Sequence, residues 1–336
     1  MTFETPRLTL RPMGAGDIDA IVDGIGNYDV ARWLSQVPYP YTKADAEEFL
    51  SRRAADGAAY WAIDAGDGLV GAVSIDDELG YWLARPAWGQ GYGFEAVHGA
   101  VTHWFKNGPK TPVKARYFLG NVRSRRVLEC LGFVPAGIET HYAKALSQDV
   151  ASQVVALDGG AWAARQRFEL ETERLRLRPL ERRDARALAA ITAPEVVRWL
   201  AAIQPNMTEA AAKAFIVKRR WQGLPGFFLA IEDRSGRLIG CVGCGGSPVT
   251  ATIFFGPEYW GHGYGSEAGG AFVAELFTRF PIEAVRAEHY TENQSSARLL
   301  ARVGFERIGE RPAFDDGPGA RIYTWRLTRK RVSRAA

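Results

Sequence analysis

Two nine-residue stretches decide the fold of this chain: WGQGYGFEA at residues 88–96 and WGHGYGSEA at residues 260–268. Seven of the nine letters are identical, and the two stretches lie 172 positions apart. Solenoid and propeller repeats have periods of roughly 20 to 50 residues, so this much longer period indicates a duplicated domain.

The similarity continues in the same order on both sides of these stretches. TPRLTLRPMGAGDIDAI (5–21) matches TERLRLRPLERRDARAL (172–188), and NVRSRRVLECLGF (121–133) matches NQSSARLLARVGF (293–305). The run LDGGAWAARQRFE (157–169), which is rich in small and polar residues, precedes the first strand of the second copy. We therefore predict two domains, residues 1–166 and 167–336.

The composition is that of an ordinary globular protein. The chain has 336 residues, 47% of them hydrophobic and 24% charged, which is enough for two domains of usual size. It contains no run of about 18 apolar residues and no apolar N-terminal segment typical of a signal peptide. We therefore expect a cytoplasmic protein without a membrane partner.

The net charge of +4 suits an anionic ligand but lacks the clustered basic face of a nucleic-acid binder. The basic run RLTRKRVSR (326–334) is interpreted as a solvated terminus. We therefore expect no nucleic-acid partner.

The cysteines and histidines do not have the spacing of a metal site. Cys241 and Cys244 form a CxxC, but it lies in an expected strand, where residues three apart point to opposite faces. His98 and His103 are five apart, which places them on different faces of a helix. We expect no metal, and interpret the cysteines as buried small residues.

The periodicity of each half predicts a mixed α/β layer structure. The pattern RLxLR places leucines toward a core and arginines toward solvent, and Asp17 and Asp184 are candidate caps for the helices that follow. Two alternating segments then predict a hairpin, and a further strand leads into the glycine stretch and a helix. A short basic strand precedes a second helix, which Gly132 or Gly304 ends in the left-handed conformation. The leucines expected to face the core are Leu8, Leu10, Leu175 and Leu177.

The glycines stand at a joint between a strand and a helix. Glycine removes side chains from the turn, so that backbone N–H groups at the positive end of the helix dipole can point outward. This arrangement binds a pyrophosphate. A tight turn without any ligand is the alternative, although its repetition in both halves favours a function. The residues concerned are Gly89, Gly91, Gly93, Gly261, Gly263 and Gly265.

Nucleotide-binding motifs fit these stretches poorly. Residues 91–96 match G-x-G-x-x-G/A, which predicts an acidic residue about 20 positions further on to bind a ribose. No acidic residue occurs between Ala96 and Leu128, whereas the second half has Glu283. The lysine and Ser/Thr of a P-loop are also missing.

The order RLxLRP, ELGYWLxxxxWGxGYGxEA and NxxSxxVLxxLGF resembles the GNAT superfamily of N-acyltransferases, and within it the RimJ/RimL-like branch. The resemblance covers nearly the whole chain, once in each half. It implies two tandem domains, each with a central, mostly antiparallel twisted sheet flanked by helices. It also implies acetyl-CoA as cosubstrate and an amine as acceptor, either a protein N-terminus or a small molecule.

The resemblance also assigns roles in cofactor binding. Backbone amides of the two glycine loops would wrap the CoA pyrophosphate, and Asn121 and Asn293 would contact the pantetheine side. Ser124 and Ser296 match the position that protonates the departing thiolate. The alternative for these four residues is capping of the helix that begins there. The loop residues are Gln90, Gly91, Tyr92, Gly93 and Phe94, and His262, Gly263, Tyr264, Gly265 and Ser266.

An attacking amine must lose a proton, because amines are largely protonated at neutral pH. Glu78 matches the position where family members carry the base. Solvent exposure is the alternative for Glu78, with two aspartates beside it. Backbone N–H groups near Leu83 and Ala84 would stabilise the oxyanion.

The second half departs from this pattern. Glu78 corresponds to Thr250, so this half either binds acyl-CoA without catalysis or takes a base from Glu258, Glu288 or His289. Phe94 stands where the family loop usually has Thr or Ser. We expect its ring to crowd the phosphate. Trp33 and Trp199 are expected to line an acceptor pocket or to belong to the core.

Two functions of different classes remain open from the sequence. The first is an acetyl-CoA-dependent N-acetyltransferase in which the amine attacks directly in a ternary complex, with one or both halves active. The second is an acyl-CoA-binding sensor or scaffold without turnover. An oxidoreductase is a weaker third interpretation.

Overall fold

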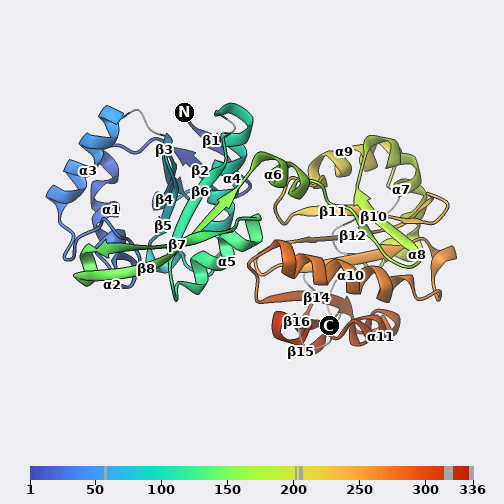
Figure 1. Cartoon of the computed structure of the whole chain (residues 1–336). Coiled ribbons are helices and arrows are strands. Elements are labelled where there is room, and N and C mark those ends of the chain that lie inside the picture. Colours follow the sequence, from blue (N-terminus) through green and yellow to red (C-terminus); the bar gives the residue numbers. More distant parts are fainter. Residues whose placement is uncertain (57–58, 110, 201–202, 204–206, 314–320, 333–336) are drawn as a thin grey trace. The chain divides into compact units, whose positions relative to one another are not determined.

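The computed structural model describes residues 1–56, 59–109, 111–200, 203, 207–313 and 321–332. The chain divides into two compact units, Met1–Arg165 and Gln166–Ala336 (Figure 1). Each unit contains one eight-stranded sheet and its own helices.

The first unit begins with a short β-hairpin and three helices, and then alternates strands with helices. Its helices and strands are β1 (Phe3–Glu4), β2 (Thr9–Arg11), α1 (Ile18–Ile25), α2 (Tyr28–Ala31), α3 (Lys43–Asp56), β3 (Ala59–Asp64), β4 (Leu69–Ile75), β5 (Leu79–Leu83), α4 (Tyr92–Asn107), β6 (Val113–Phe118), α5 (Val122–Leu131), β7 (Val134–Ala143), β8 (Gln148–Leu157) and α6 (Gly159–Arg165).

The second unit repeats this order. Its helices and strands are β9 (Leu170–Glu171), β10 (Leu175–Pro179), α7 (Ala185–Ile191), α8 (Pro194–Val197), α9 (Glu209–Arg219), β11 (Phe227–Asp233), β12 (Leu238–Gly245), β13 (Thr250–Phe255), α10 (Tyr264–Arg279), β14 (Ala284–Tyr290), α11 (Gln294–Val303), β15 (Glu306–Pro312), β16 (Arg321–Thr328) and α12 (Arg329–Val332).

The two sheets have the same topology. The strand order is β1-β2-β3-β4-β5-β6-β8-β7 in the first unit and β9-β10-β11-β12-β13-β14-β16-β15 in the second. Neighbouring strands are antiparallel except for β5 with β6 and β13 with β14, which are parallel. The expected fold class, two tandem domains each with a mostly antiparallel sheet and flanking helices, is confirmed.

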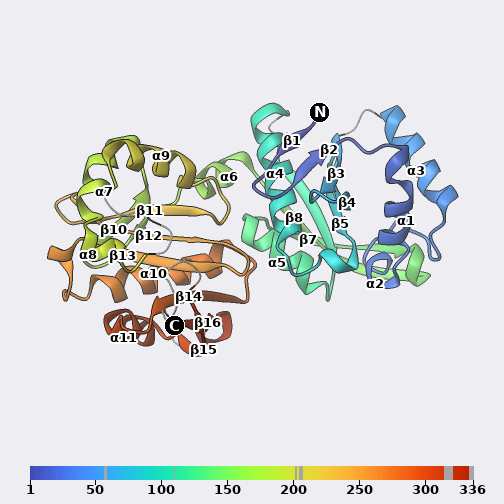
Figure 2. The same cartoon turned by 180° about the vertical axis from the view of Figure 1, so that it is seen from behind.

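Helices cover both faces of each sheet. In the first unit, α1 and α3 lie on one face, and α4 and α5 lie on the other (Figures 1 and 2). A Cβ on Gly24 of α1 would stand 2.5 Å from the Trp82 ring, and a Cβ on Gly93 of α4 would stand 3.7 Å from the Tyr81 ring. Trp82 and Tyr81 therefore point to opposite faces of β5, as alternate strand residues must.

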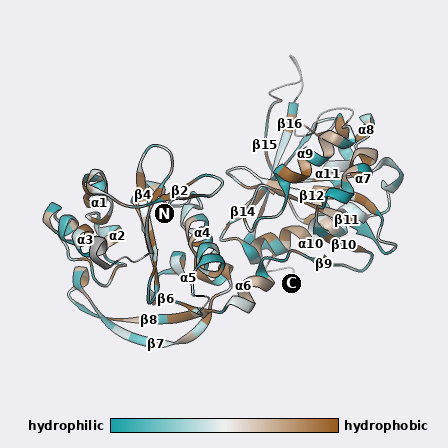
Figure 3. Ribbon diagram, turned by 90° about the horizontal axis from the view of Figure 1, so that it is seen from above, coloured by the Kyte–Doolittle hydropathy of each residue, from teal (hydrophilic) through white to brown (hydrophobic). Residues whose placement is uncertain are grey.

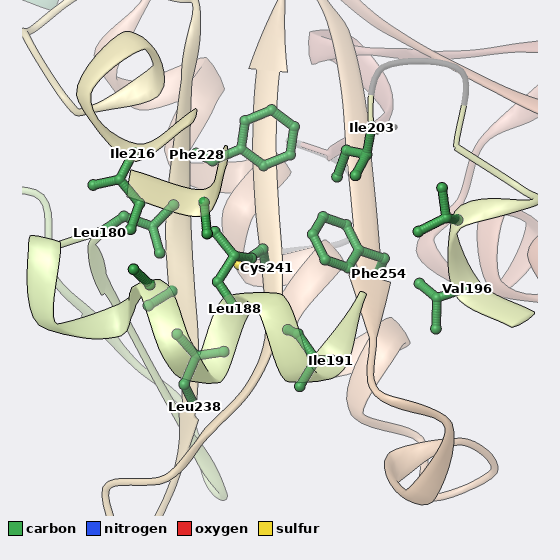
Figure 4. Close-up of a cluster of buried hydrophobic side chains, with 14 residues drawn as sticks. Leu180, Leu188, Ile191, Val196, Ile203, Ile216, Phe228, Leu238, Cys241 and Phe254 are labelled. Carbon is green, nitrogen blue, oxygen red and sulfur yellow. The ribbon is translucent and has the colours of Figure 1, made fainter. Parts of the chain in front are cut away.

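The core between the second sheet and α7, α8 and α9 is built from aliphatic and aromatic side chains (Figure 4). Phe228, Cys241 and Phe254 come from three adjacent strands, and Leu188 and Ile216 come from the helices that cover them. All five are at least 94% buried, so the cluster removes most of their apolar surface from water.

The RLxLR segments lie as expected for their leucines but not for all their arginines. Leu8, Leu10, Leu175 and Leu177 are buried, which confirms their core orientation. Arg178 is also buried, with 6% of its surface exposed, so the expectation that the arginines face solvent is wrong there. Its guanidinium donates to both carboxylate oxygens of Asp184, at 2.7 and 2.8 Å, and to Glu232 at 2.6 Å.

The two aspartates expected to cap helices bind arginines instead. Asp17 accepts from Arg11 at 2.8 and 3.0 Å and from the Gly14 amide at 2.9 Å. The bond from Gly14 closes a capping box in the turn before α1, but the Asp17 side chain makes no cap hydrogen bond to α1 itself. Asp184 does the same with Arg178. Hydrogen bonds with these arginines hold the pKa of both carboxyls below the ordinary aspartate value.

The segment between the two copies is ordered rather than a loose linker. It contains α6, and Trp162 of this helix is buried beside His98 at a ring-centroid distance of 5.1 Å. Phe168, three residues beyond α6, is fully buried in the second unit against Trp221, with ring centroids 4.9 Å apart. Buried aromatic residues on both sides of Arg165 explain why the division into units falls there.

The hairpin of β7 and β8 forms the outer edge of the first sheet. Figure 3 shows it curving beside the unit, with hydrophilic and hydrophobic segments along its length. The Lys144 amide, at its tip, donates to the Ser35 carbonyl at 3.0 Å. The hairpin therefore reaches the segment that follows α2.

The basic run near the C-terminus is structured up to residue 332. Arg329 donates to the carbonyls of Phe280 and Ile282 at 2.7 and 3.1 Å, and α12 begins there. Residues 333 and 334 of the run lie outside the described residues. Within the described part of the chain, every helix is too short or too polar to cross a bilayer.

Candidate active site

The glycine loops have a backbone that only glycine adopts without strain. Gly89 and Gly91 have φ of 78° and 80°, and Gly261 and Gly263 have φ of 80° and 81°. These values lie in the left-handed region, which disfavours residues with a Cβ. The repetition of glycine in both copies is therefore required by the shape of the turn.

Each loop leads directly into a helix whose N-terminus has no side-chain cap. Gly91 and Gly263 occupy the N-cap positions of α4 and α10, and no described side chain accepts a hydrogen bond as their cap. The amides of the first turn are therefore available to an anion. The Phe94 ring is buried, with 5% exposed, and packs near His98. The expectation that Phe94 crowds a phosphate is therefore wrong, because its ring points into the core.

An arginine and a glutamate hold each loop from behind. Glu95 accepts from the Arg7 amide and side-chain Nε, both at 2.7 Å, and from the Thr5 hydroxyl at 2.7 Å. Arg7 Nη1 donates to the Gln90 carbonyl at 2.8 Å, and its guanidinium lies 5.0 Å from the Tyr92 ring centroid. This contact fixes the Gln90 carbonyl on Arg7 and so restricts the conformation of the loop.

The second unit repeats this clamp. Thr172, Arg174 and Glu267 make the same bonds at 2.6 to 2.8 Å, and Arg174 donates to the His262 carbonyl at 2.9 Å. The sequence did not reveal this role, although the signal was present. Both TxR and GYGxEA recur at matching positions in the two halves. Arginines that simply face solvent, as predicted, would not explain why the two motifs recur together.

The repeated tryptophans tie the loops to the preceding strands. Trp88 Nε1 donates to the Leu83 carbonyl at 2.9 Å, and Trp260 Nε1 donates to the Phe255 carbonyl at 3.0 Å. Each bond fixes the start of the glycine turn relative to the last residue of its strand.

The parallel strands beside each loop pair only at their beginnings. β5 and β6 pair with each other at Leu79 and Ala115, and beyond these residues each strand pairs only with its other neighbour, β4 or β8. The Ala84 amide donates to Val70 of β4 at 2.9 Å, so it is not free to meet an oxyanion. By the alternation of an antiparallel ladder, the Leu83 amide points to the other side, toward β6.

The asparagine before the second helix caps it in both units. Asn121 Oδ1 accepts from the Ser124 amide at 3.1 Å, and Asn293 Oδ1 accepts from the Ser296 amide at 3.0 Å. The capping alternative is therefore observed, and it uses only the side-chain oxygen. The amide NH₂ groups remain able to donate to a ligand.

Ser124 has a partner that the sequence did not reveal. The Tyr81 hydroxyl donates to Ser124 Oγ at 3.0 Å. Burial raises the pKa of the Tyr81 phenol. Tyr81 points toward α4 and α5, so this pair lies on the same face of β5 as the glycine turn.

Glu78 lies on the opposite face and is not simply exposed. Its carboxylate accepts from Arg116 Nε at 2.6 Å and from Arg116 Nη2 in a two-bonded pair. Arg116 also contacts His141 and lies 3.6 Å from Glu139. The hydrogen bond that Arg116 donates to Glu78 raises the pKa of Arg116, so this guanidinium stays charged.

The second unit has a different charge arrangement at this place. Thr250 replaces Glu78, and Glu288, which stands at the position of Arg116, pairs with Arg311 at 2.8 Å. Trp199 lies on this face, with its ring 6.2 Å from that of Tyr290. Trp33 contacts its neighbour Arg32, whose guanidinium is 4.8 Å from the ring centroid.

The other candidate bases of the second unit lie elsewhere. His289 follows Glu288 on the strand and so points to the opposite face, where its Nδ1 meets the Tyr290 carbonyl at 2.7 Å. Burial lowers its pKa, and its Nε2 has no partner among the described residues. Glu258 lies in the turn after β13, at the far end of the strand from Thr250.

The cysteines of the CxxC are buried in β12. Burial raises the pKa of both thiols, to about 12 for Cys244. The described residues contain no group of three or more His, Cys, Asp or Glu side chains arranged to hold a metal ion.

This geometry has the parts of a group-transfer site. In the first unit, open helix-terminal amides lie at one end of β5 and a carboxylate at the other, with a hydroxyl pair on the opposite face from the carboxylate. The uncapped amides suit an anionic group such as a phosphate, and the carboxylate and the hydroxyl pair are groups that can exchange protons.

Comparison with known proteins gives matches in both halves. The family model described as acetyltransferase (GNAT) domain matches residues 7–134 and 174–306. The uncharacterized N-acetyltransferase YoaA of Bacillus subtilis is 30% identical over 148 residues, covering 42% of this chain and 84% of that protein. The uncharacterized N-acetyltransferase p20 of Bacillus licheniformis is 27% identical over 157 residues, covering 43% of this chain and 88% of that protein. Each of these two relatives therefore has about the length of one half.

Among solved structures, an acetyltransferase from T. thermophilus is similar to this chain. The two are 25% identical with a TM-score of 0.44, over 48% of this chain and 92% of the other.

Proposed function

Because the chain belongs to the acetyltransferase (GNAT) family through both halves and is an acetyl-CoA-dependent acyltransferase, we propose that its first half transfers an acetyl group to a primary amine by direct attack in a ternary complex. The acceptor is a protein N-terminus or a small-molecule amine, as in the RimJ/RimL-like branch. The proposal treats residues 1–166 and 167–336 as separate domains, which the two compact units support.

The observation that carries the proposal is the pair of uncapped helix N-termini behind left-handed glycines. In the first half, amides at Gln90–Phe94 would hold the CoA pyrophosphate, and Asn121 Nδ2 would meet the pantetheine arm. In the second half, residues 262–266 and Asn293 would have the same roles. The clamps of Arg7 with Glu95 and of Arg174 with Glu267 pre-form each loop, so little ordering is needed on binding.

The chemistry follows from the two faces of β5. An ammonium acceptor approaching from the α1/α3 face would lose a proton to Glu78, directly or through water, and the free amine would attack the thioester carbon. The Leu83 amide would stabilise the oxyanion. The sulfur would leave on the α4/α5 face, where Ser124 would donate a proton.

The pair with Arg116 leaves Glu78 able to accept a further hydrogen bond. Its two bonds use one lone pair on each carboxylate oxygen, and each oxygen keeps a second for the acceptor. The pair also fixes the direction of the carboxylate, which a lone exposed glutamate would not achieve. Positioning within about 0.5 Å is what general-base catalysis requires.

For the second half, a specific observation favours binding without turnover. It keeps the glycine loop and clamp but lacks an acid at Thr250, and Ile253 stands where the first half has Tyr81. The second candidate function, an acyl-CoA-binding sensor, therefore applies to this half. Glu288, which pairs with Arg311 at 2.8 Å, is the remaining candidate base there.

The test is thiol release from acetyl-CoA with a panel of primary amines. Glu78→Gln can accept one of the two hydrogen bonds from Arg116 but cannot take a proton, so we expect kcat to fall about 100-fold with little change in the KM for acetyl-CoA. The matched control is Asp77→Asn, which removes a neighbouring carboxylate. Equal activity of wild type and Glu78→Gln would refute the role of Glu78 as base. If wild type binds acetyl-CoA but releases no thiol with any amine, the enzyme proposal fails and the acyl-CoA-binding sensor is the function that remains.

A further inference from the structure

We infer that Tyr81 is a positioning residue for the proton that reaches the departing sulfur, acting through its hydrogen bond to Ser124. This inference rests on the proposed function. Its observation is the 3.0 Å bond from the Tyr81 hydroxyl to Ser124 Oγ, which joins β5 to the first turn of α5 across 43 residues of sequence.

The contacts around Ser124 determine where its own hydrogen can go. The Ser124 amide is bound by Asn121 Oδ1, so the first turn of α5 is fixed. Ser124 Oγ accepts from Tyr81, which occupies one lone pair and restricts rotation of the hydroxyl. The serine hydrogen is left to donate to a different acceptor, and the pair adjoins the region where β5 and β6 are unpaired.

The hydrogen bond also changes the strength of the serine as a donor. A hydroxyl that accepts a hydrogen bond becomes a better donor, because the two bonds polarise each other in a low-dielectric site. An isolated serine is a weak acid, and protonation of a thiolate by it needs this assistance. Tyr81 supplies it without losing its own proton, consistent with the raised pKa of the buried phenol.

The reaction then balances as follows. The amine nitrogen forms the C–N bond and the carbonyl π electrons move to oxygen. The intermediate collapses, the C–S bond breaks and its electron pair goes to sulfur. Ser124 gives its hydroxyl proton to sulfur and regains one from solvent. Nitrogen loses two protons, one before the attack, when the ammonium becomes the free amine, and one after the C–N bond has formed. Glu78 takes each of them in turn and passes it to solvent.

The position of the pair separates the two proton transfers. Tyr81 adjoins the glycine turn, since a Cβ on Gly93 would stand 3.7 Å from its ring. Glu78 is three residues earlier in the sequence and faces the other side of the sheet. The proton removed from the amine and the proton given to sulfur thus travel on opposite faces, so neither group competes with the other.

The second half lacks the pair. Ser296 keeps the cap from Asn293, but the residue that corresponds to Tyr81 is Ile253, whose side chain has no polar atom. A shared hydroxyl pair is therefore a property of the first half, although both halves have the serine. The sequence alone, which repeats the serine, cannot make this distinction.

The experiment is a double-mutant cycle on the full chain, with thiol release as readout. We expect Tyr81→Phe to lower kcat about 10-fold and Ser124→Ala to lower it about 30-fold, each with KM for acetyl-CoA within about 2-fold. The double variant should equal Ser124→Ala, because Tyr81 acts only through the serine. Tyr117→Phe, a tyrosine on the adjacent strand, is the matched control and should leave kcat unchanged.

The outcomes separate this inference from the proposed function. Two outcomes would overturn the role of Tyr81 but not the proposed function. Either wild type turns over and Tyr81→Phe has the same kcat, or the losses of the two single variants multiply in the double variant. Absence of turnover by wild type with every amine would overturn both. If Tyr81→Phe does not fold, Ser124→Thr and Ser124→Val provide the test, since they have the same shape but only Thr keeps an oxygen for Tyr81. Equal kcat for Thr and Val would overturn the inference.

Discussion

The two halves of the chain are alike at one end of the site and different at the other. At the glycine loops, left-handed glycines, an uncapped helix, an Arg–Glu clamp and a tryptophan tie occur twice with distances that agree within about 0.2 Å. At the other end, around Glu78 and Thr250, charges and hydroxyls differ. The difference teaches that a duplicated glycine loop does not imply that the side chains around it are duplicated.

One ion pair shows this divergence clearly. Arg116 of β6 lies 3.6 Å from Glu139 of β7, and at the same positions Glu288 of β14 pairs with Arg311 of β15 at 2.8 Å. The sign of each charge is exchanged while the pair is kept. The ion pair between these two strands is thus kept in both halves, but its charges stand on opposite strands.

The largest expected difference between the halves is in the stability of two arginine triads, Arg178 with Asp184 and Glu232 and Arg11 with Asp17 and Asp64. Arg178 with Asp184 and Glu232 has side chains 7% to 9% exposed, whereas the Arg11 side chain is 29% exposed. Arg178→Ala should therefore destabilise its unit by about 3–5 kcal/mol, because it leaves two buried carboxylates unpaired. Arg11→Ala should cost roughly 1–2 kcal/mol. Urea unfolding of each variant measures both.

Acid unfolding sharpens the same comparison. Asp17 and Asp184 have folded pKa values below the unfolded value, so their contribution is present above about pH 3.9 and is lost as pH falls through the folded pKa. Arg178→Ala should move the acid limb of unfolding to higher pH. If Arg178→Ala and Arg11→Ala lower the free energy of unfolding by the same amount, the deeper burial of the Arg178 triad does not increase its contribution to stability.

A smaller effect is expected on cofactor stoichiometry. Wild type should bind two CoA molecules per chain, and Gly91→Val or Gly263→Val should each weaken one site about 100-fold, since a β-branched residue cannot hold φ near 80°. Calorimetry with CoA counts the sites. Gly66→Val and Gly236→Val, at hairpin turns with φ of 103° and 79°, impose the same strain elsewhere. Loss of CoA binding in these controls would contradict the loop assignment.

The sequence predicted what the repeats share and missed what side chains do across the sheet. The duplication, the strand order around the glycines and the left-handed ends at Gly132 and Gly304 followed from local patterns, and the structure has φ of 91° and 99° there. The partners of Glu78 and Ser124 did not, because Arg116 and Tyr81 lie about 40 residues away and meet them only through sheet register. Long-range pairs of this kind are invisible to periodicity, which reports only which face a residue takes.

The smallest predicted difference concerns exposed cations beside the first loop. Trp88 lies between Arg85 and Arg123, whose guanidinium carbons are 4.7 and 4.4 Å from its ring centroid, while the second half has Pro257 and Ser295 at these positions. A cation near a polyanion at the surface contributes little and is screened by salt, so Arg123→Ala should weaken CoA binding to the first half by about 2- to 3-fold at low salt and less at about 0.5 M. Calorimetry in the Gly263→Val background measures CoA binding to the first half only. Arg326→Ala, which removes a cation from the second half, is the control and should not change this affinity. Because the effect acts through charge alone, Arg123→Lys should bind CoA as tightly as wild type. If Arg123→Lys binds as weakly as Arg123→Ala, Arg123 contributes through stacking on Trp88 instead. The halves would then differ here in packing rather than in electrostatics.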